Sequence, residues 1–350
     1  MKDIERKILT LSAGGPASVG YTRSIRLSNL RVILYGLDSD KYNLMRAETD
    51  VKVVCPRHSD ANFDDFLLKY IEKFSIDFIH AQSESDVFAV GRLKSKIEGL
   101  GCKVFLPSLE EIEIFRDKWK SYSLWLEAGI KVPKNIYINN VEDLESAFQV
   151  FGADIWIRET IGAAGKGSLS RPKFEEALAQ INHDNSWGKI VAAEHLSRDT
   201  VTWQSIWWEG DLISCQGRRR LNWAFSNRAQ SGVTGLTGVG ETLSDPYLDE
   251  LSSKCVKAAN EEPHGIYSVD FTYDLHGIPN PTEINIGKFF TTHEFFSQAG
   301  LNMPAIVQDL VFGSHRNHKN SWINPLEDGL LWIRGIDCLP ILTSRKDLSL

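Results

Sequence analysis

The segment SVDFTYDLHGIPNPTEINIGKFF, residues 268–290, predicts two β-strands joined by a turn rich in Gly, Pro and Asn. Side chains alternate faces along an extended chain, so Glu283 and Asn285 point to one side and the isoleucines beside them to the other. Pairing of the strands across residues 274–281 brings Asp270 near both. Such oxygen donors suit Mg²⁺, which usually takes only one or two carboxylates. An edge strand with a solvated polar face is the alternative.

The composition predicts a soluble protein of two or three domains, because 350 residues with 42% hydrophobic side chains can form several cores. The chain has 39 Lys and Arg against 46 Asp and Glu, a net charge of −7, which argues against nucleic acid as the partner. No apolar run is long enough for a membrane span or a signal peptide, so we expect a cytoplasmic protein with no membrane partner. Five cysteines without Cys-x-x-Cys spacing indicate free, buried thiols.

The first ~107 residues alternate predicted strands and helices, as in a parallel, doubly wound α/β sheet. The strands are expected at 7–11, 31–38, 76–81 and 102–107, and the helices at 23–30, 62–74 and 87–100. The turn after the first strand contains Gly14, Gly15 and Gly20. Their spacing differs from G-x-G-x-x-G, so NAD binding is the weaker alternative for this unit.

A single helix is expected within residues 108–133, with Ser108 and Glu111 as a capping box and Gly129 at its end. Pro107 marks a domain boundary before it. Further helices are predicted at 141–152 and 247–261.

Two segments can bind an anion. In TIGAAGKGSLS, residues 160–170, small side chains let backbone amides approach a phosphate while Lys166 adds positive charge; an ordinary flexible hairpin is the alternative. Arg218 and Arg220 share one face of a predicted strand that follows a hairpin turn at 209–211. Such a pair either grips a carboxylate or phosphate or is simply solvated.

Three other segments carry less specific signals. The tryptophans Trp203, Trp207 and Trp208 are expected to pack in the core rather than stack on bases. Residues 231–242 predict a mobile loop that closes over a ligand. The nearby histidines His315 and His318 lie in a polar loop, where metal binding is not expected.

Taken in order, four motifs give the chain a family resemblance. They are RDKWKSYSLWLEAGIKVP (116–133), IWIRETIGAAGKGS (155–168), VAAEHL (191–196), and the pair SVDFTYD (268–274) and PTEINIGKF (281–289). With them, residues 8–313 resemble the ATP-grasp superfamily, in particular its carbamoyl-phosphate synthase large-subunit-like carboxylate–amine ligases.

This resemblance implies an α/β and α+β fold, in which a doubly wound parallel-sheet (pre-ATP-grasp) domain precedes a two-lobed ATP-grasp domain. The implied parts are the parallel-sheet domain (1–107), the linker helix and small lobe (108–188), the large lobe (189–315) and a C-terminal extension (316–350).

The resemblance also implies roles for the matching residues. Lys118 and Arg158 would contact the phosphates of ATP. Asp270, Glu283 and Asn285 would bind two Mg²⁺ ions, with Mn²⁺ as a substitute. The loop over the phosphates would comprise Gly162, Gly165, Lys166 and Gly167, and the adenine hinge Glu194, His195 and Leu196.

Two positions depart from the family pattern. Val201 stands where the family has an acid that holds the ribose, and Asp199 is the nearby candidate for that contact. Gly287 stands where the family has an arginine, which leaves Lys288, Arg218 and Arg220 as candidates for the catalytic cation.

The implied activity is ATP-dependent joining of a small-molecule carboxylate to an amine through an acylphosphate. The sequence leaves the oligomeric state open; a homodimer is the common case among soluble oligomers. The amine is expected near the N-terminal domain and residues 231–242. The alternatives are a carbamoyl-phosphate-type kinase, an ATP-binding partner subunit that has lost turnover, and an NAD-linked dehydrogenase.

Overall fold

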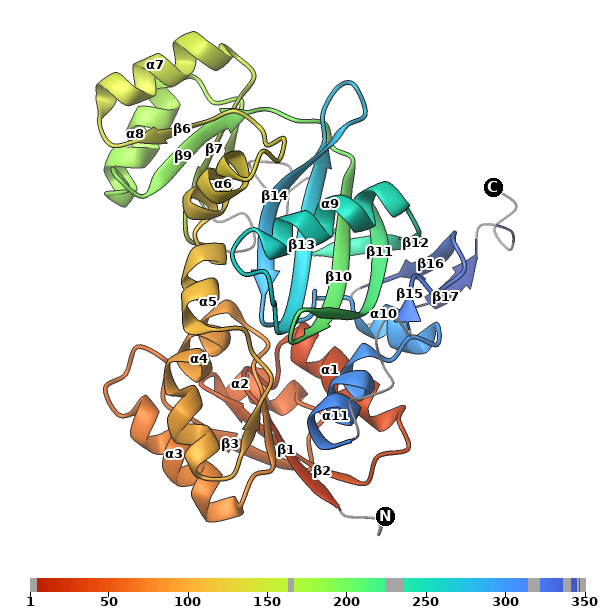
Figure 1. Ribbon diagram of the computed structural model, residues 1–350. Coiled ribbons are helices and arrows are strands. Elements are labelled where there is room, and N and C mark those ends of the chain that lie inside the picture. The colour runs from red at the N-terminus through yellow and green to blue at the C-terminus, as the bar shows by residue number, and fades with distance from the viewer. Residues whose placement is uncertain are drawn as a thin grey trace.

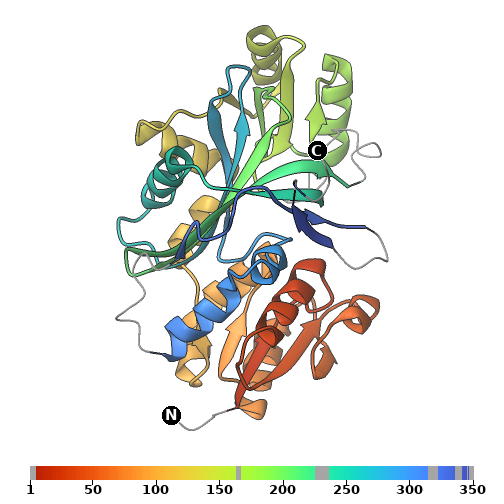
Figure 2. The ribbon, with the colours of Figure 1, turned by 90° about the vertical axis from the view of Figure 1, so that its right-hand side faces the viewer.

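Three β-sheets organise the part of the chain that the computed structural model describes (Figure 1). In Figure 2 a parallel sheet lies at one end, a small sheet with two helices at the other, and a large sheet between them. The described residues are 5–162, 167–224, 236–313, 322–335, 341–344 and 346.

The N-terminal sheet is parallel and has the strand order β3-β2-β1-β4-β5, which confirms the expected doubly wound arrangement. Its strands are β1 (Arg6–Thr10), β2 (Val32–Asp38), β3 (Val51–Val54), β4 (Phe78–His80) and β5 (Lys103–Val104). The connecting helices are α1 (Pro16–Arg26), α2 (Lys41–Arg46), α3 (Phe63–Phe74) and α4 (Glu84–Gly99). Figure 1 shows α3 and α4 on one side of the sheet and α1 on the other.

Helix α1 begins earlier than expected, because Pro16 occupies its first turn, where a missing N–H costs nothing. Gly20 therefore lies inside the helix and not in the turn. A Cβ at Gly20 would lie 3.4 Å from the Cβ of Glu294, an ordinary van der Waals separation, so α1 packs directly against the C-terminal part of the chain here.

The single helix expected within 108–133 is wrong: the structure has two, α5 (Leu109–Phe115) and α6 (Lys118–Glu127). The Ser108–Glu111 capping box is confirmed. Asp117 interrupts the helix because its side chain accepts hydrogen bonds from the backbone N–H groups of Trp119 and Lys120 and so starts a new helix. The interruption places Lys118 at a helix N-terminus.

The small antiparallel sheet has the order β6-β9-β7-β8. Its strands are β6 (Asn135–Ile138), β7 (Ile155–Glu159), β8 (Leu169–Ser170) and β9 (Ile190–Glu194). Helices α7 (Val141–Phe151) and α8 (Phe174–Asp184) bury their apolar faces against it and form a separate core.

The large sheet has the path β14-β13-β10-β11-β12-β16-β17, with β15 beside β11. Its strands are β10 (Thr200–Trp208), β11 (Asp211–Trp223), β12 (Thr237–Leu243), β13 (Gly265–Tyr273), β14 (Pro279–Ile286), β15 (Trp322–Ile323), β16 (Leu330–Ile333) and β17 (Ile341–Ser344). Helix α9 (Pro246–Lys257) packs on one face, and α10 (Glu294–Gln298) and α11 (Met303–Phe312) follow β14.

Several expectations for this region can be compared with the structure. The hairpin at 209–211 is confirmed, and Trp203 and Trp207 are buried in the core. The expected loop at 231–242 is wrong for its second half, because Thr237–Leu243 forms β12; residues 231–235 lie outside the described part. His315 and His318 also lie outside it. Among the described cysteines, Cys102, Cys215 and Cys255 are buried and free, and Cys55 is free and partly buried.

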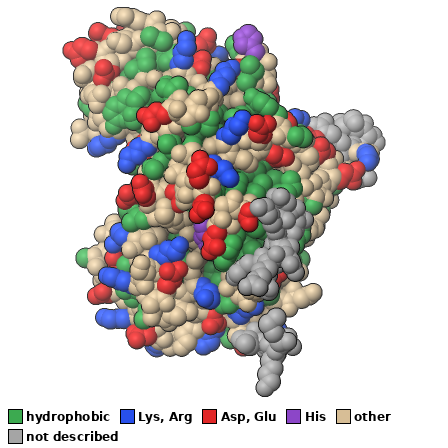
Figure 3. Space-filling view, viewed as in Figure 1, with side chains coloured by type: hydrophobic (Ala, Val, Ile, Leu, Met, Phe, Trp, Pro, Cys, Tyr) green, Lys and Arg blue, Asp and Glu red, His purple; other side chains and the backbone are tan. Residues whose placement is uncertain are grey.

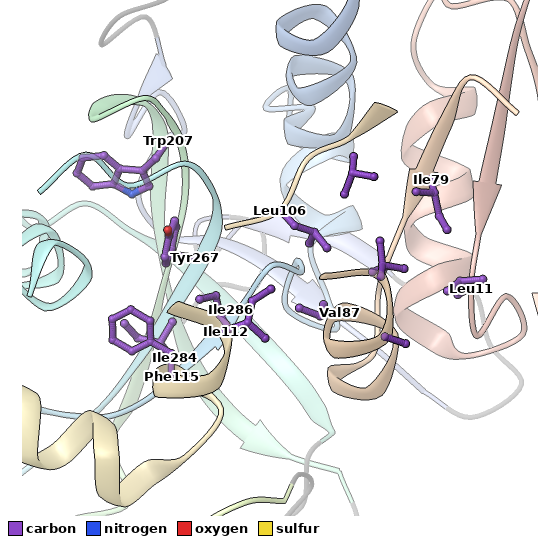
Figure 4. Close-up of a cluster of buried hydrophobic side chains, with 14 of the residues drawn as sticks. Leu11, Ile79, Val87, Leu106, Ile112, Phe115, Trp207, Tyr267, Ile284 and Ile286 are labelled. Atoms are coloured by element: carbon purple, nitrogen blue, oxygen red, sulfur yellow. The ribbon is translucent and has the colours of Figure 1, made fainter. Parts of the chain in front are cut away.

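One apolar core joins the parallel sheet to the large sheet. Figure 4 shows it running from Leu11 and Ile79 through Val87 and Leu106 to Ile112, Phe115, Tyr267, Ile284 and Ile286. The two sheets are therefore held in a fixed relation by buried apolar surface. No helix among the described residues is long and apolar enough to cross a membrane.

Two polar contacts reinforce this junction. The Tyr267 hydroxyl donates to Glu111 Oε1 at 2.7 Å, so the capping-box carboxylate of α5 also binds β13. His80, at the end of β4, stacks on Tyr21 with ring centroids 3.7 Å apart, and its Nε2 lies 2.7 Å from Gln82 Oε1. Gln82 in turn donates to the Phe289 carbonyl at 2.7 Å. The loop after β14 is thus tied to the first sheet.

The first prediction concerns the Glu111–Tyr267 contact. Tyr267→Phe should lower the free energy of unfolding by about 1–3 kcal/mol, because a buried carboxylate loses a donor. Urea unfolding measures the change. Tyr42→Phe, at a position that is 74% exposed, is the matched control and should stay within about 0.5 kcal/mol of wild type. Equal stability of the two variants would contradict the prediction.

The second prediction concerns pH. Burial lowers the pKa of His80 to about 4 and that of His293 to about 3. The unfolded chain binds protons at these histidines near pH 6.5 while the folded protein does not, so the free energy of unfolding should fall as the pH drops from about 6.5 toward 4. Urea unfolding at several pH values measures this slope. His80→Phe should reduce the slope, whereas His276→Gln, in an exposed turn, should keep it. An unchanged slope in His80→Phe would contradict the assignment.

Candidate active site

A cavity of about 270 Å³ lies between the parallel sheet, the α5–α6 junction and the face of the large sheet opposite α9. The N-terminal unit contributes Ala17, Gln82, Glu84 and Val87, and the junction contributes Arg116 and Lys118. The large sheet and the loop after β14 contribute Thr202, Arg218, Arg220, Trp223, Thr237, Asp270, Glu283, Asn285, Lys288, Phe289 and Phe290.

The acid–amide group predicted from the sequence is assembled here. Asp270 on β13 and Glu283 on β14 are direct register partners, and Asn285 Nδ2 donates to Asp270 Oδ2 at 3.1 Å. The register shifts just after Asp270, where Phe271 pairs with Pro281. The expected convergence of these three side chains on one face is confirmed.

Several cations surround the two carboxylates. Lys118 Nζ lies 3.5 Å from Glu283 Oε2, and Lys288 Nζ donates to Asn285 Oδ1 at 2.6 Å. Arg220 lies 4.0 Å from Asp270 Oδ1. Arg158 Nη2 donates to the Thr282 carbonyl at 3.1 Å, beside Glu283. The positive charges at the site thus come from four separate parts of the chain: α6, β7, β11 and the loop after β14.

The pKa shifts show how these charges oppose one another. Burial raises the pKa of Asp270, against the pull of Arg220. Burial also acts to raise the pKa of Glu283, but Lys118, Arg158 and Lys288 outweigh it and hold that pKa below its usual value. Glu283 is therefore the carboxylate that stays ionised most readily.

Arg218 and Arg220 share a face of β11, as predicted, while Arg219 points to the other face and lies 3.7 Å from Glu241. Arg220 donates to the hydroxyls of Thr237 and Thr200 and lies over the Trp223 ring at 3.8 Å. Arg218 is only 1% exposed.

Packing explains why a glycine stands at position 287, where the resemblance leads us to expect an arginine. Its φ of 71° lies in the left-handed region, and a Cβ there would lie 2.7 Å from Val87 and 2.9 Å from Leu106. A side chain at this position would collide with the first unit. Lys288, the next residue, lines the cavity instead.

The ends of the predicted phosphate loop lie close to one another. Gly162 accepts a hydrogen bond from Lys118 Nζ through its carbonyl at 2.7 Å. Gly162 and Gly167 have positive φ angles of 154° and 69°, which favour glycine, and a Cβ at either position would lie near the Glu159 carboxylate. Gly165 and Lys166 lie outside the described residues.

The predicted hinge and ribose residues do not line the cavity. Glu194 Oε1 accepts from the Lys134 N–H at 2.8 Å, and His195 Nε2 lies 3.1 Å from Ser170 Oγ. Leu196 is partly buried, and Asp199 is exposed. These contacts assign none of them to a nucleotide, so their roles stay predictions.

The residues at the cavity fit Mg²⁺ by their chemistry. Two carboxylates and an amide oxygen are hard donors of the kind that Mg²⁺ prefers, and they leave positions for phosphate oxygens and water. The described residues contain no group of three or more His, Cys, Asp and Glu side chains that could bind a metal by themselves. A metal held by Asp270 and Glu283 would complete its coordination with the Asn285 amide oxygen, water or ligand oxygens.

Sequence reasoning missed Thr202, Gln82 and Glu84. Thr202 donates to Asp270 Oδ1, and alternation in TVTW could have placed it on the same face as Arg218. Gln82 and Glu84 follow β4 at the carboxyl end of a parallel sheet, where ligands commonly bind.

Comparisons with known proteins agree with this architecture. No family model matches the chain. Alanine–anticapsin ligase of Bacillus amyloliquefaciens is 23% identical over 240 residues, which cover 63% of this chain and 48% of the relative. The same enzyme of Bacillus subtilis gives the same values. The chain thus spans about half the length of the curated relatives it matches.

Solved structures are similar over nearly the whole chain. The biotin carboxylase domain of Hydrogenobacter thermophilus 2-oxoglutarate carboxylase, in complex with MgADP and bicarbonate, has a TM-score of 0.71 at 14% identity and covers 94% of this chain and 73% of its own.

Two further structures give similar values. N5-carboxyaminoimidazole synthetase of Staphylococcus aureus, complexed with ADP, has a TM-score of 0.70 at 12% identity. The match covers 96% of this chain and 84% of the synthetase. L-amino acid ligase of Bacillus licheniformis has a TM-score of 0.67 at 12% identity. The match covers 95% of this chain and 79% of the ligase. The chain therefore shares the fold of these structures, which agrees with the two-part α/β architecture that the resemblance of its motifs implied.

Proposed function

We propose that this protein is an ATP-dependent ligase that activates a small-molecule carboxylate as an acylphosphate and joins it to an amine. The observation that carries the proposal is the cavity, where Asp270, Glu283 and Asn285 face Lys118, Lys288 and Arg220. Similar structures were solved with ADP or MgADP, which supports ATP and Mg²⁺ as cofactors; two metal ions, and Mn²⁺ as a substitute, stay predictions.

The reaction needs no protein nucleophile. A carboxylate oxygen attacks the γ-phosphorus of ATP, and the bond to ADP breaks. The amine nitrogen then attacks the acyl carbon, the phosphate leaves, and the nitrogen loses a proton. Phosphoryl transfer depends mainly on positioning and on neutralising charge.

The side chains of the site divide this work. Lys118, at the start of α6 and hydrogen-bonded to Gly162, would bind phosphate oxygens at the base of the loop, together with Arg158. Asp270, Glu283 and Asn285 would hold Mg²⁺, which supplies positive charge to the phosphate oxygens when bound. Arg220 and Lys288 reach the cavity and would stabilise charge on the reacting groups.

The identity of the partners is also a proposal. The names of the curated relative and of one solved neighbour make amino acids the first class of carboxylate and amine to test. Figure 3 shows Lys and Arg intermixed with Asp and Glu on the visible face, so this face offers no extended basic surface for nucleic acid. A homodimer and a cytoplasmic location stay predictions.

The third prediction tests the metal site. Glu283→Gln keeps the shape of the side chain but removes its charge, and kcat for ADP release should fall roughly 10²–10³-fold, as for the loss of one preorganised electrostatic group. Asp274→Asn, in the same hairpin but paired with Lys131 outside the cavity, is the matched acid-to-amide control and should keep its activity. Circular dichroism checks the fold. Full activity in Glu283→Gln would refute the proposal.

The fourth prediction tests the reaction class through ADP release with paired acids and amines. A ligase releases ADP fastest when both partners are present, and mass spectrometry should find the amide product. A carbamoyl-phosphate-type kinase would instead turn over with bicarbonate or carbamate and no added amine. ATP binding without ADP release for any pair would favour a partner subunit without turnover.

A further inference from the structure

One row of polar side chains crosses the large sheet from strand to strand. Arg218 on β11 pairs in register with Thr202 on β10, Thr202 with Asp270 on β13, and Asp270 with Glu283 on β14. Directly opposite residues on neighbouring strands present their side chains to the same face. The row therefore leads from a buried arginine to the two carboxylates of the cavity.

The hydroxyl of Thr202 connects the two ends of this row. Arg218 Nη2 donates to Thr202 Oγ1 at 2.7 Å, and the same Oγ1 donates to Asp270 Oδ1. The second oxygen of Asp270 accepts from Asn285 Nδ2 at 3.1 Å. Asp270 is thus fixed from both sides, and each of its oxygens keeps further acceptor capacity for a ligand in the cavity.

Among the described residues, Arg218 forms no direct ion pair with a carboxylate. Its other hydrogen bonds go to the hydroxyls of Thr237 at 3.2 Å and Thr292 at 2.8 Å, and its guanidinium lies 4.5 Å from the centre of the Phe290 ring. Burying a charge without a direct counter-ion costs free energy. The Thr202 hydroxyl lies between Arg218 and Asp270. In a site of low dielectric, its two hydrogen bonds link the positive charge of Arg218 to the Asp270 carboxylate.

We propose that Arg218 and Thr202 are positioning residues, which hold the Asp270 carboxylate in the orientation that binds a divalent cation. This inference rests on the proposed function, in which Asp270 is a metal ligand. It gives Arg218, expected from the sequence to be a catalytic cation, an indirect role. Arg218 lines the cavity together with Arg220 and Lys288, but its hydrogen bonds leave Arg220 and Lys288 as the candidates for direct contact with the reacting groups.

The test compares two substitutions at one position. Thr202→Val keeps the shape but removes the hydroxyl, whereas Thr202→Ser keeps the hydroxyl. Binding of Mn²⁺ to the full chain in the presence of ADP, measured by the electron paramagnetic resonance signal of free Mn²⁺, gives a readout that does not depend on turnover. We expect binding to weaken roughly 10-fold or more in Thr202→Val, as for other residues that orient metal ligands, and to stay near wild type in Thr202→Ser.

Thr242→Val is the matched control. Thr242 is 2% exposed against 1% for Thr202, and its hydroxyl donates to the Glu327 carbonyl and not to Asp270. This variant should lose comparable folding stability in urea but bind Mn²⁺ like wild type. Equal weakening in Thr242→Val or in Thr202→Ser, or unchanged binding in Thr202→Val, would overturn the inference.

Glu283→Gln separates this inference from the function on which it rests. If Glu283→Gln loses Mn²⁺ binding while Thr202→Val retains it, the metal site stands and the role of Thr202 is wrong. If Glu283→Gln binds Mn²⁺ like wild type, the metal site itself is wrong and the inference falls with it.

Discussion

Two carboxylates, Asp270 and Glu283, face each other across neighbouring strands inside the protein. Like charges at such a distance repel, and burial makes each of them costly, so the arrangement persists only where cations compensate it. Those cations are Lys118 from α6, Arg158 from β7, Arg220 from β11 and Lys288 from the loop after β14. The site therefore requires α6, the small sheet and the large sheet all to lie next to Asp270 and Glu283.

The junction with the parallel sheet supplies the remaining wall. Apolar side chains continue from that sheet through α4 and α5 to β14, and the contact between Glu111 and Tyr267 joins α5 to β13 (Figure 4). Gln82 and Glu84 reach the cavity only because this core holds the two units together. A similar overall fold recurs in structures that share 12–14% identity with this chain, since packing and pairing preserve a fold while most side chains change.

The same packing explains the two positions at which the sequence departs from the family that its motifs resemble. Gly287 lies against Val87 and Leu106 in a left-handed conformation, so the positive charge at this end of the cavity comes from neighbouring residues. Val201 is 1% exposed and points into the core, on the face opposite Thr202. A carboxylate at that position would be buried among apolar side chains. At both positions, packing disfavours the charged side chain that the resemblance implies.

Local patterns in the sequence predicted much of this protein. Strand and helix periodicity gave the doubly wound sheet, the Ser108–Glu111 capping box marked the start of α5, and alternation placed Asp270, Glu283 and Asn285 on one face. These features could be predicted because each depends on residues that are close in the sequence or belong to one short hairpin. Asp117 is a residue type that starts helices, so the sequence also contained a signal for the break there. We predicted one helix because helical periodicity continues on both sides of Asp117.

Tertiary structure alone decided which distant residues share the site. Thr202 reaches Asp270 because β10 lies between β11 and β13, and Arg218 is buried because β12 and the loop after β14 cover it. The pairing of Thr202 with Arg218 follows from the β10–β11 hairpin, but the contacts with β13, with β12 and with the loop after β14 arise from sheet order and long-range packing. The sequence thus determined which polar and charged side chains are available to the site, and the fold determined which of them touch.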